Sequence, residues 1–250
     1  GIIQEGQKKG KKVVLNPLIT CGQCFYCKNE REHLCEKRVL LGMNRPVERQ
    51  GCFAELVLTP DKNIYELPTT LDIKQAPIAE PTAVSLHAVE LGNEVLKKPL
   101  DQARVLVIGG GAIGLLCALI LEKYKKCKEI ILVEPNEKRL KVCGNHLESE
   151  TLKPDNKKIK DNSFDIVFDT VGLEITRNNS IKAVNPGGVI VHIGLTQPSG
   201  DFNFRKATLQ EITFVGTYCY TNKDFSNTIN LLSSQKLGKL DWIEYRELSK

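Results

Sequence analysis

The residues best suited to chemistry are four cysteines near the start of the chain. Cys21, Cys24, Cys27 and Cys35 follow the spacing C-x2-C-x2-C-x7-C. Four thiolates at these spacings can surround one tetrahedral Zn²⁺ with no open position, which is typical of a structural site. An iron–sulfur cluster, which also uses closely spaced cysteines, and disulfides are the alternatives. We expect His33, which lies between the last two cysteines, to face solvent because four thiolates complete the shell.

A glycine-rich turn is the second feature with chemical potential. The apolar run Arg104–Ile108 leads into G-G-G-A-I-G, and a helical pattern follows. The first glycine permits a tight turn, the second lets the backbone approach a pyrophosphate, and the third allows close packing of helix on strand. The free N–H groups of the helix start then face the phosphates. The residues expected at this dinucleotide site are Gly109, Gly111, Ala112, Ile113 and Gly114.

An acidic residue after the next strand indicates which dinucleotide is bound. Glu134 follows Gly114 by about 20 residues, where an acid accepts hydrogen bonds from the ribose hydroxyls and repels a 2′-phosphate. The sequence therefore predicts NAD in preference to NADP. Capping of the following helix is the alternative role of Glu134. Arg139 stands about one helical turn later and either covers the adenine or is a plain surface residue.

The elements that position these residues divide the chain in two. Residues 1–83 hold short apolar runs between turn residues, and the runs at 13–15, 53–58 and 63–67 predict strands of a mainly β domain. Residues 84–222 alternate apolar strands with helices, which indicates a doubly wound parallel sheet. The expected strands are 104–108, 129–133, 164–168, 189–193 and 212–218, and the expected helices are 84–91, 113–124, 137–142 and 175–183. A helix over 225–237 opens the C-terminal part, 223–250.

Composition excludes several classes of protein. The chain of 250 residues is 41% hydrophobic and 26% charged, as in a globular protein. Its net charge of +5 comes from scattered lysines, which predicts a solvated surface and no nucleic-acid partner. No apolar stretch reaches the roughly 20 residues needed to span a bilayer. The sequence opens without a secretory signal, so we expect a cytoplasmic protein with reduced thiols.

The cysteine lobe and the dinucleotide turn together resemble those of the zinc-dependent medium-chain dehydrogenases. These are the relatives of alcohol, sorbitol and threonine dehydrogenases. The stretch 16–35 looks like the zinc lobe of that family, and Gly51-Cys52-Phe53-Ala54-Glu55 looks like its G-G-F-A-E motif. The stretch 80–88, E-P-T-A-V-S-L-H-A, resembles the E-P-x-x-V-x-x-H-A of the polyol and sugar branch.

The resemblance implies an architecture and further site residues. The first domain would be GroES-like and the second a Rossmann domain, with the chain returning to the first domain at its end. Thr170, Gly172, Ile193 and Gly194 match the loops beside the nicotinamide in the family. A homodimer or homotetramer would form by pairing of the last Rossmann strand, 212–218, across a two-fold axis.

The sequence departs from the family at three places. The family pattern places a cysteine and a histidine, both ligands of a catalytic zinc, in a segment ending in G-H-E that would precede Gly1. Residues 5–10 and 143–161 also look contracted against the family, which has a third strand and its helix in the second stretch. Glu80 matches a third ligand of the catalytic zinc in the family. Its alternative role is a capping or salt-bridging carboxylate.

The resemblance implies hydride transfer between a small alcohol and NAD. A catalytic zinc would lower the pKa of the substrate hydroxyl, and a polyol or sugar alcohol is the expected substrate. Two other functions remain open: a zinc-independent reductase, and a non-catalytic nucleotide-binding relative of the same fold.

Overall fold

The computed structural model describes residues 1–43 and 48–246, so the last four residues of the expected C-terminal part lie outside it. Its contacts divide the chain into two compact units. Unit 1 comprises residues 1–83, 219–236 and 240–250, and unit 2 comprises 84–218 and 237–239. Within the described residues, no helix is both long and apolar enough to cross a membrane.

Unit 1 is built from short antiparallel strand pairs. Strand β1 (Val13–Leu15) pairs with β4 (Ile64–Glu66), and β2 (Leu18–Ile19) pairs with β3 (Val39–Leu40). A single turn of helix, α1 (Phe25–Lys28), follows β2. The returning chain adds α7 (Asn222–Ser233), whose Phe225 packs edge-on against Tyr65 of β4 with ring centroids 4.9 Å apart.

Unit 2 contains a six-stranded parallel sheet in the order β10-β9-β8-β5-β6-β7. Its strands are β5 (Arg104–Ile108), β6 (Glu129–Val133), β7 (Glu150–Leu152), β8 (Phe164–Asp169), β9 (Val184–His192) and β10 (Thr213–Gly216). The order reverses at β5, because the first three strands run to one edge and the last three to the other. In such sheets ligands bind beyond the carboxyl ends of the strands at this reversal.

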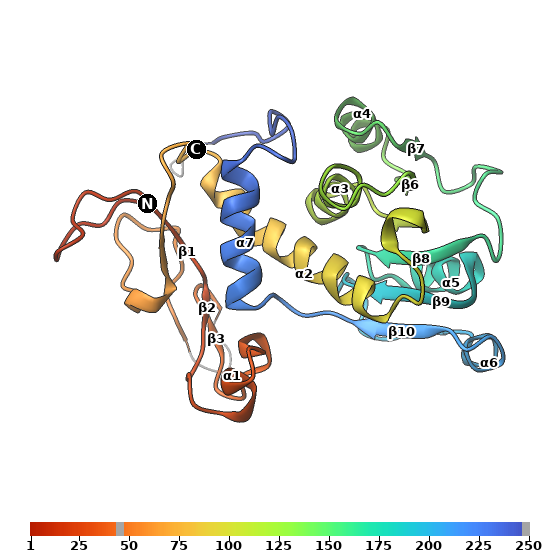
Figure 1. The fold of residues 1–250 in the computed structure, drawn as a ribbon, viewed down its shortest axis with the longest axis horizontal. Coiled ribbons are helices and arrows are strands. Elements are labelled where there is room, and N and C mark those ends of the chain that lie inside the picture. Colours follow the sequence, from red (N-terminus) through yellow and green to blue (C-terminus); the bar gives the residue numbers. More distant parts are fainter. Residues whose placement is uncertain (44–47, 247–250) are drawn as a thin grey trace. The chain divides into compact units, whose positions relative to one another are not determined.

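Helices cover both faces of this sheet, as continuous apolar strands require. The helices of this region are α2 (Ala79–Val95), α3 (Ala112–Leu119), α4 (Glu137–His146), α5 (Glu174–Ala183) and α6 (Phe204–Leu209). Helices α3 and α4 lie on one side of the strands and α5 on the other (Figure 1). The predicted doubly wound parallel sheet, in a chain that also has a β domain, is therefore confirmed.

Two expectations about elements, a strand at 53–58 and a helix at 225–237, need correction. Residues 53–58 form no strand: Phe53 and Leu58 are 92% and 89% exposed, and no partner strand satisfies this backbone among the described residues. The predicted helix 113–124 is confirmed, as α-helix up to Leu119 and as a π-helical turn over Ile120–Tyr124. The helix predicted at 225–237 spans 222–233 instead, since Thr221 caps its start. In the contracted stretch 143–161 the third strand of the family pattern is present as β7, and no helix follows it before β8.

Candidate functional site

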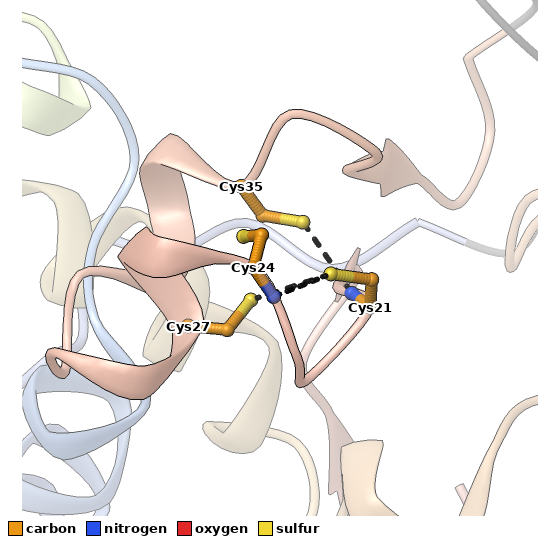
Figure 2. Close-up of side chains that lie close together, drawn as sticks. All are labelled: Cys21, Cys24, Cys27 and Cys35. Carbon is orange, nitrogen blue, oxygen red and sulfur yellow. Dashed lines mark hydrogen bonds between the residues drawn. The ribbon is translucent and has the colours of Figure 1, made fainter.

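The four cysteines predicted to bind metal converge at one point of unit 1. Their sulfur atoms all lie within 4.8 Å of one another (Figure 2), and no other group of three or more potential ligands occurs among the described residues. Gly22 adopts a φ of +75°, which allows the tight turn between the first two ligands. All nine cysteines of the chain are free thiols, so the disulfide alternative is not realised.

Electrostatics within the cluster favour a cation at its centre. Backbone N–H groups of Gln23 and Cys24 donate to the Cys21 sulfur and lower the pKa of that thiol to about 6. Burial, reinforced by the neighbouring thiols, raises the pKa of Cys27 to about 12. Thiolates this close repel one another unless a cation compensates them, and a coordinating metal deprotonates its thiols outright. The donor set fits one structural Zn²⁺.

His33 does not face solvent, which corrects the expectation from sequence. It is only 6% exposed and lies in the short 3-10 turn Glu32–Leu34, packed inside the lobe. It is not among the residues that converge as ligands. Its neighbour Glu32 accepts a hydrogen bond from Asn222, and Asn222 in turn accepts one from Asn16. The lobe is thereby tied to the start of α7.

The glycine turn after β5 has the shape expected of a phosphate-binding loop. Gly109 adopts a φ of +104°, which few other residues tolerate. A Cβ atom on Gly114 would lie 1.9 Å from the carbonyl oxygen of Gly109, so the helix packs directly on the strand. In contrast, a Cβ atom on Gly111 would meet nothing within 4 Å. Gly111 is the N-cap of α3, and its surroundings leave room for a phosphate group.

Glu134 lies against this turn and is almost fully buried. Its carboxylate accepts hydrogen bonds from the backbone N–H of Gly110, at 2.7 Å, and from that of Asn136, at 2.8 Å. The cap of α4 is Asn136, whose side chain accepts from the N–H of Arg139, so Glu134 does not act as that cap. Gly110 itself was not anticipated. Its place inside the glycine motif was the available signal.

The loops after β8 and β9 pack backbone on backbone. A Cβ atom on Gly172 would lie 2.0 Å from the carbonyl oxygen of Gly194, and Gly172 adopts a φ of +75°. The N–H groups of Ile193 and Gly194 both donate to the carbonyl oxygen of Asp169. The hydroxyl of Thr170 donates to the carbonyl oxygen of Ile108, which ties this loop to β5. Residues from β5, β8 and β9 are thus brought to one edge of the sheet.

Two buried charged residues that sequence reasoning missed hold these loops. The Asp169 carboxylate accepts from the N–H groups of Val171 and Gly172, and Arg177 donates to the carbonyl oxygens of Gly172 and Ser199. Asp169 is wholly buried, and Arg177 is 9% exposed. A carboxylate at a strand end followed by an arginine in the next helix is the signal that could have found them.

Glu80 lies in the first turn of α2, within unit 1. Burial raises the pKa of its carboxyl, and the nearby hydroxyl of Tyr220 opposes this shift. Tyr220 is fully buried, and its hydroxyl has no partner in hydrogen-bond geometry within the described chain. The two groups therefore lie close together in the interior of unit 1. Among the described residues, Glu80 belongs to no group of three or more potential metal ligands.

Comparison with known proteins gives matches over both units. A family model described as the alcohol dehydrogenase GroES-like domain matches residues 2–69, and one described as a zinc-binding dehydrogenase matches residues 112–234. Probable D-xylulose reductase A of Neosartorya fischeri is 27% identical over 250 residues, which is 95% of this chain and 67% of that protein. The chain thus spans about two thirds of the length of this relative.

Solved structures agree in fold. A zinc-binding dehydrogenase of Sinorhizobium meliloti 1021 bound to NADP superposes with a TM-score of 0.83 at 24% identity, over 97% of this chain and 72% of that one. An alcohol dehydrogenase of E. coli CFT073 complexed with NADH gives a TM-score of 0.81 at 21% identity, over 92% and 67%. At these identities the likeness concerns the fold alone.

Proposed function

Because the chain belongs to the zinc-binding, medium-chain dehydrogenase family, we propose that it is an oxidoreductase that transfers a hydride between a polyol or sugar alcohol and NAD. The observation that carries this proposal is the glycine turn, open at Gly111 and bordered by the Glu134 carboxylate. The relative named D-xylulose reductase supports a sugar-alcohol substrate. A non-catalytic nucleotide-binding relative is the second candidate.

The residues present fit a dinucleotide. The N–H groups at the start of α3, around Gly111, Ala112 and Ile113, would hold the pyrophosphate. Glu134 would accept hydrogen bonds from the adenosine ribose, and Arg139, exposed on α4, would cover the adenine. The nicotinamide half would lie against the remaining loop residues, which are Thr170, Gly172, Ile193 and Gly194.

The chemistry is divided between cofactor and protein. A bound nicotinamide would supply the hydride chemistry, and the residues of this chain would supply its position and electrostatics. The Asp169 and Arg177 contacts hold the loop around Gly172 in place, so the ring would meet a preorganised surface. A misplacement of about 1 Å can cost about 10²-fold in rate, which explains why buried charges are used here.

The two zinc sites implied by the family differ in how well this chain can build them. The four cysteines make a complete structural site. We also propose Glu80 as a ligand of a catalytic zinc, but an open catalytic zinc needs three protein ligands. One carboxylate among the described residues does not hold such an ion by itself.

Assembly and location complete the proposal. Strand β10 lies at an edge of the sheet, and Phe214 on it is 44% exposed. Sheet edges are liabilities that proteins cover, so we propose pairing of β10 across a two-fold axis in a homodimer or homotetramer. A cytoplasmic location, a small-molecule partner and the absence of nucleic-acid and membrane partners belong to the same proposal.

The test is an assay of NAD and NADP reduction with a panel of polyols, sugar alcohols and simple alcohols, together with NADH titration. Turnover of a polyol with NAD supports the proposal. NADH binding without turnover of any alcohol would favour the non-catalytic alternative, and turnover that survives complete zinc removal would favour a zinc-independent reductase.

A further inference from the structure

The connection from β7 to β8 is unusual for a parallel sheet. Parallel strands are normally joined by a crossover of a dozen or more residues that is usually a helix. Here residues 153–163 cross the face of β6 and β5 without any helix. Ile159 is the side chain of this connection that packs on the sheet core. A single isoleucine covers much less of the sheet than a helix would.

A pocket of about 360 Å³ lies on the sheet face next to this connection. We call it the crossover pocket. Its floor is formed by Leu106 and Ile108 of β5 and Val133 of β6, and α5 contributes Ile175 and Ala183 to one wall. Ile175 is 65% exposed at the rim, although it is a large apolar side chain. The pocket is therefore an uncovered part of the apolar core.

The two ends of the crossover pocket differ in charge. At the carboxyl ends of the strands its lining includes Gly109 and Pro135, which are uncharged. At the amino ends it includes Lys160 and Lys182, which are brought together because the N–H of Asn162 donates to the carbonyl oxygen of Lys182. Neither lysine side chain has an ion-pair partner within the described residues.

One carboxylate, that of Asp161, also lines the lysine end. It lies near Lys206: burial lowers the pKa of Lys206, and the charge of Asp161 opposes that shift. Asp161 therefore has a cation of its own outside the pair formed by Lys160 and Lys182. The lysine end keeps an excess of positive charge, while the rest of the lining is uncharged and, apart from Thr176 and Asn179, carries no polar side chain.

We propose that the crossover pocket binds a free fatty acid. The carboxylate of the ligand would lie between Lys160 and Lys182, and its hydrocarbon chain would lie over Leu106 and Ile108 toward Gly109. An apolar pocket of 300–1,000 Å³ with a few well-placed polar groups is the usual form of a small-molecule site. The ligand would cover the apolar surface that a crossover helix would otherwise bury, and this gain drives binding.

The test is titration of the full chain, without nucleotide, with dodecanoate below its micellar concentration. Dodecanol tests the contribution of the hydrocarbon chain of the ligand without its charge, and acetate tests the contribution of the carboxylate alone. We expect dodecanoate to bind more tightly than dodecanol, and acetate not to bind. In the double variant Lys160→Ala/Lys182→Ala the Kd for dodecanoate should rise by about tenfold, while that for dodecanol stays the same. Both lysines are exposed, so folding is unaffected.

Two controls keep the result specific. Lys97→Ala/Lys128→Ala removes the same charge from exposed positions outside the pocket and should leave dodecanoate binding unchanged. Asn179→Trp places a bulky side chain at the exposed edge of the pocket and should abolish binding of both dodecanoate and dodecanol.

Two outcomes would overturn the proposal. In the first, dodecanoate fails to bind, or its binding is insensitive to the pocket variants. In the second, Asn179→Trp weakens the binding of NADH and leaves the binding of dodecanoate unchanged, which would assign the pocket to the adenine of the dinucleotide.

Discussion

Replacing Gly111 by alanine should separate nucleotide binding from folding. Gly111 has a φ of −74°, which alanine adopts freely, and a Cβ atom there meets nothing within 4 Å. Gly→Ala at a compatible position stabilises by about 0.4–1 kcal/mol through the unfolded chain. Alanine is a poorer N-cap than glycine by a similar amount, so the net change in stability is about zero.

The same methyl group would occupy the space in which a pyrophosphate meets the start of α3. Loss of one charge-assisted hydrogen bond costs about 1.5–3 kcal/mol, which corresponds to a roughly 10- to 150-fold rise in the Kd for NADH. NADH titration by fluorescence, with thermal unfolding measured in parallel, checks both expectations.

Gly114→Ala is the matched comparison for this variant. Its Cβ atom would lie 1.9 Å from the carbonyl oxygen of Gly109, a backbone atom that cannot move aside cheaply. We expect a loss of about 3 kcal/mol and a fall in the unfolding midpoint of roughly 6–12 °C. Wild-type NADH affinity in the folded Gly111→Ala variant would refute the assignment of the glycine turn as a phosphate site.

Three further predictions concern the metal, the cofactor and pH. Cys24→Ser should remove the bound zinc and lower the unfolding temperature by about 5 °C or more, whereas Cys52→Ser should change neither. Metal analysis measures the zinc content and calorimetry the unfolding temperature. An unchanged zinc content in Cys24→Ser would contradict the prediction. Glu134→Gln keeps one acceptor but loses the charge, so NADH should bind about tenfold more weakly and the difference in affinity between NADH and NADPH should narrow. Glu137→Gln, on the exposed start of α4, should have no effect on either affinity. Equal use of NADP by the wild type would oppose the prediction. Burial lowers the pKa of His192, so its contribution to stability is present above the unfolded pKa of about 6.5 and is lost as the pH falls through the folded value. The urea midpoint should therefore drop between pH 7.5 and 5.5, and this drop should be smaller in His192→Gln; an equal drop in both proteins would exclude His192 as its cause.

The convergence of the four cysteines was predictable because its geometry is local. Cys21 and Cys35 are joined by a single lobe, so their spacing along the chain already limits their separation in space. The same argument failed for His33. Spacing indicates which side chains can reach a metal, but burial depends on what packs over the lobe, and here Glu32 beside it is bonded to Asn222, almost 200 residues later.

The glycine turn beside Glu134 was predictable for a different reason. In a parallel sheet the carboxyl ends of all strands meet at one edge, so a glycine motif after one strand and an acid after the next must be neighbours. The hydrogen-bond partners of Glu134 did not follow from the sequence pattern. Its carboxylate accepts from the backbone N–H of Gly110, in the glycine turn, as well as from the turn after its own strand. Buried loop-holding residues such as Arg177 were missed since they contribute to no motif.

The incorrectly predicted strand at 53–58 shows the limit of hydrophobic patterns. Its composition suits a strand, but a strand exists only where another strand accepts its backbone hydrogen bonds. The described residues offer none to Phe53 or Leu58, and both side chains are exposed. In contrast, β7 is only three residues long, yet it forms because Thr151 pairs with Leu132 of β6. Pairing, not apolar content, decides between the two segments.

The pair formed by Glu80 and Tyr220 joins a motif residue to one that no motif indicates. The Tyr220 hydroxyl is fully buried and interacts with the Glu80 carboxyl, whose pKa burial raises. Removing two titratable groups from water costs free energy. Proteins tolerate such unfavourable local arrangements mainly at functional sites, so the burial of this pair supports the proposed functional role of Glu80 over a capping one.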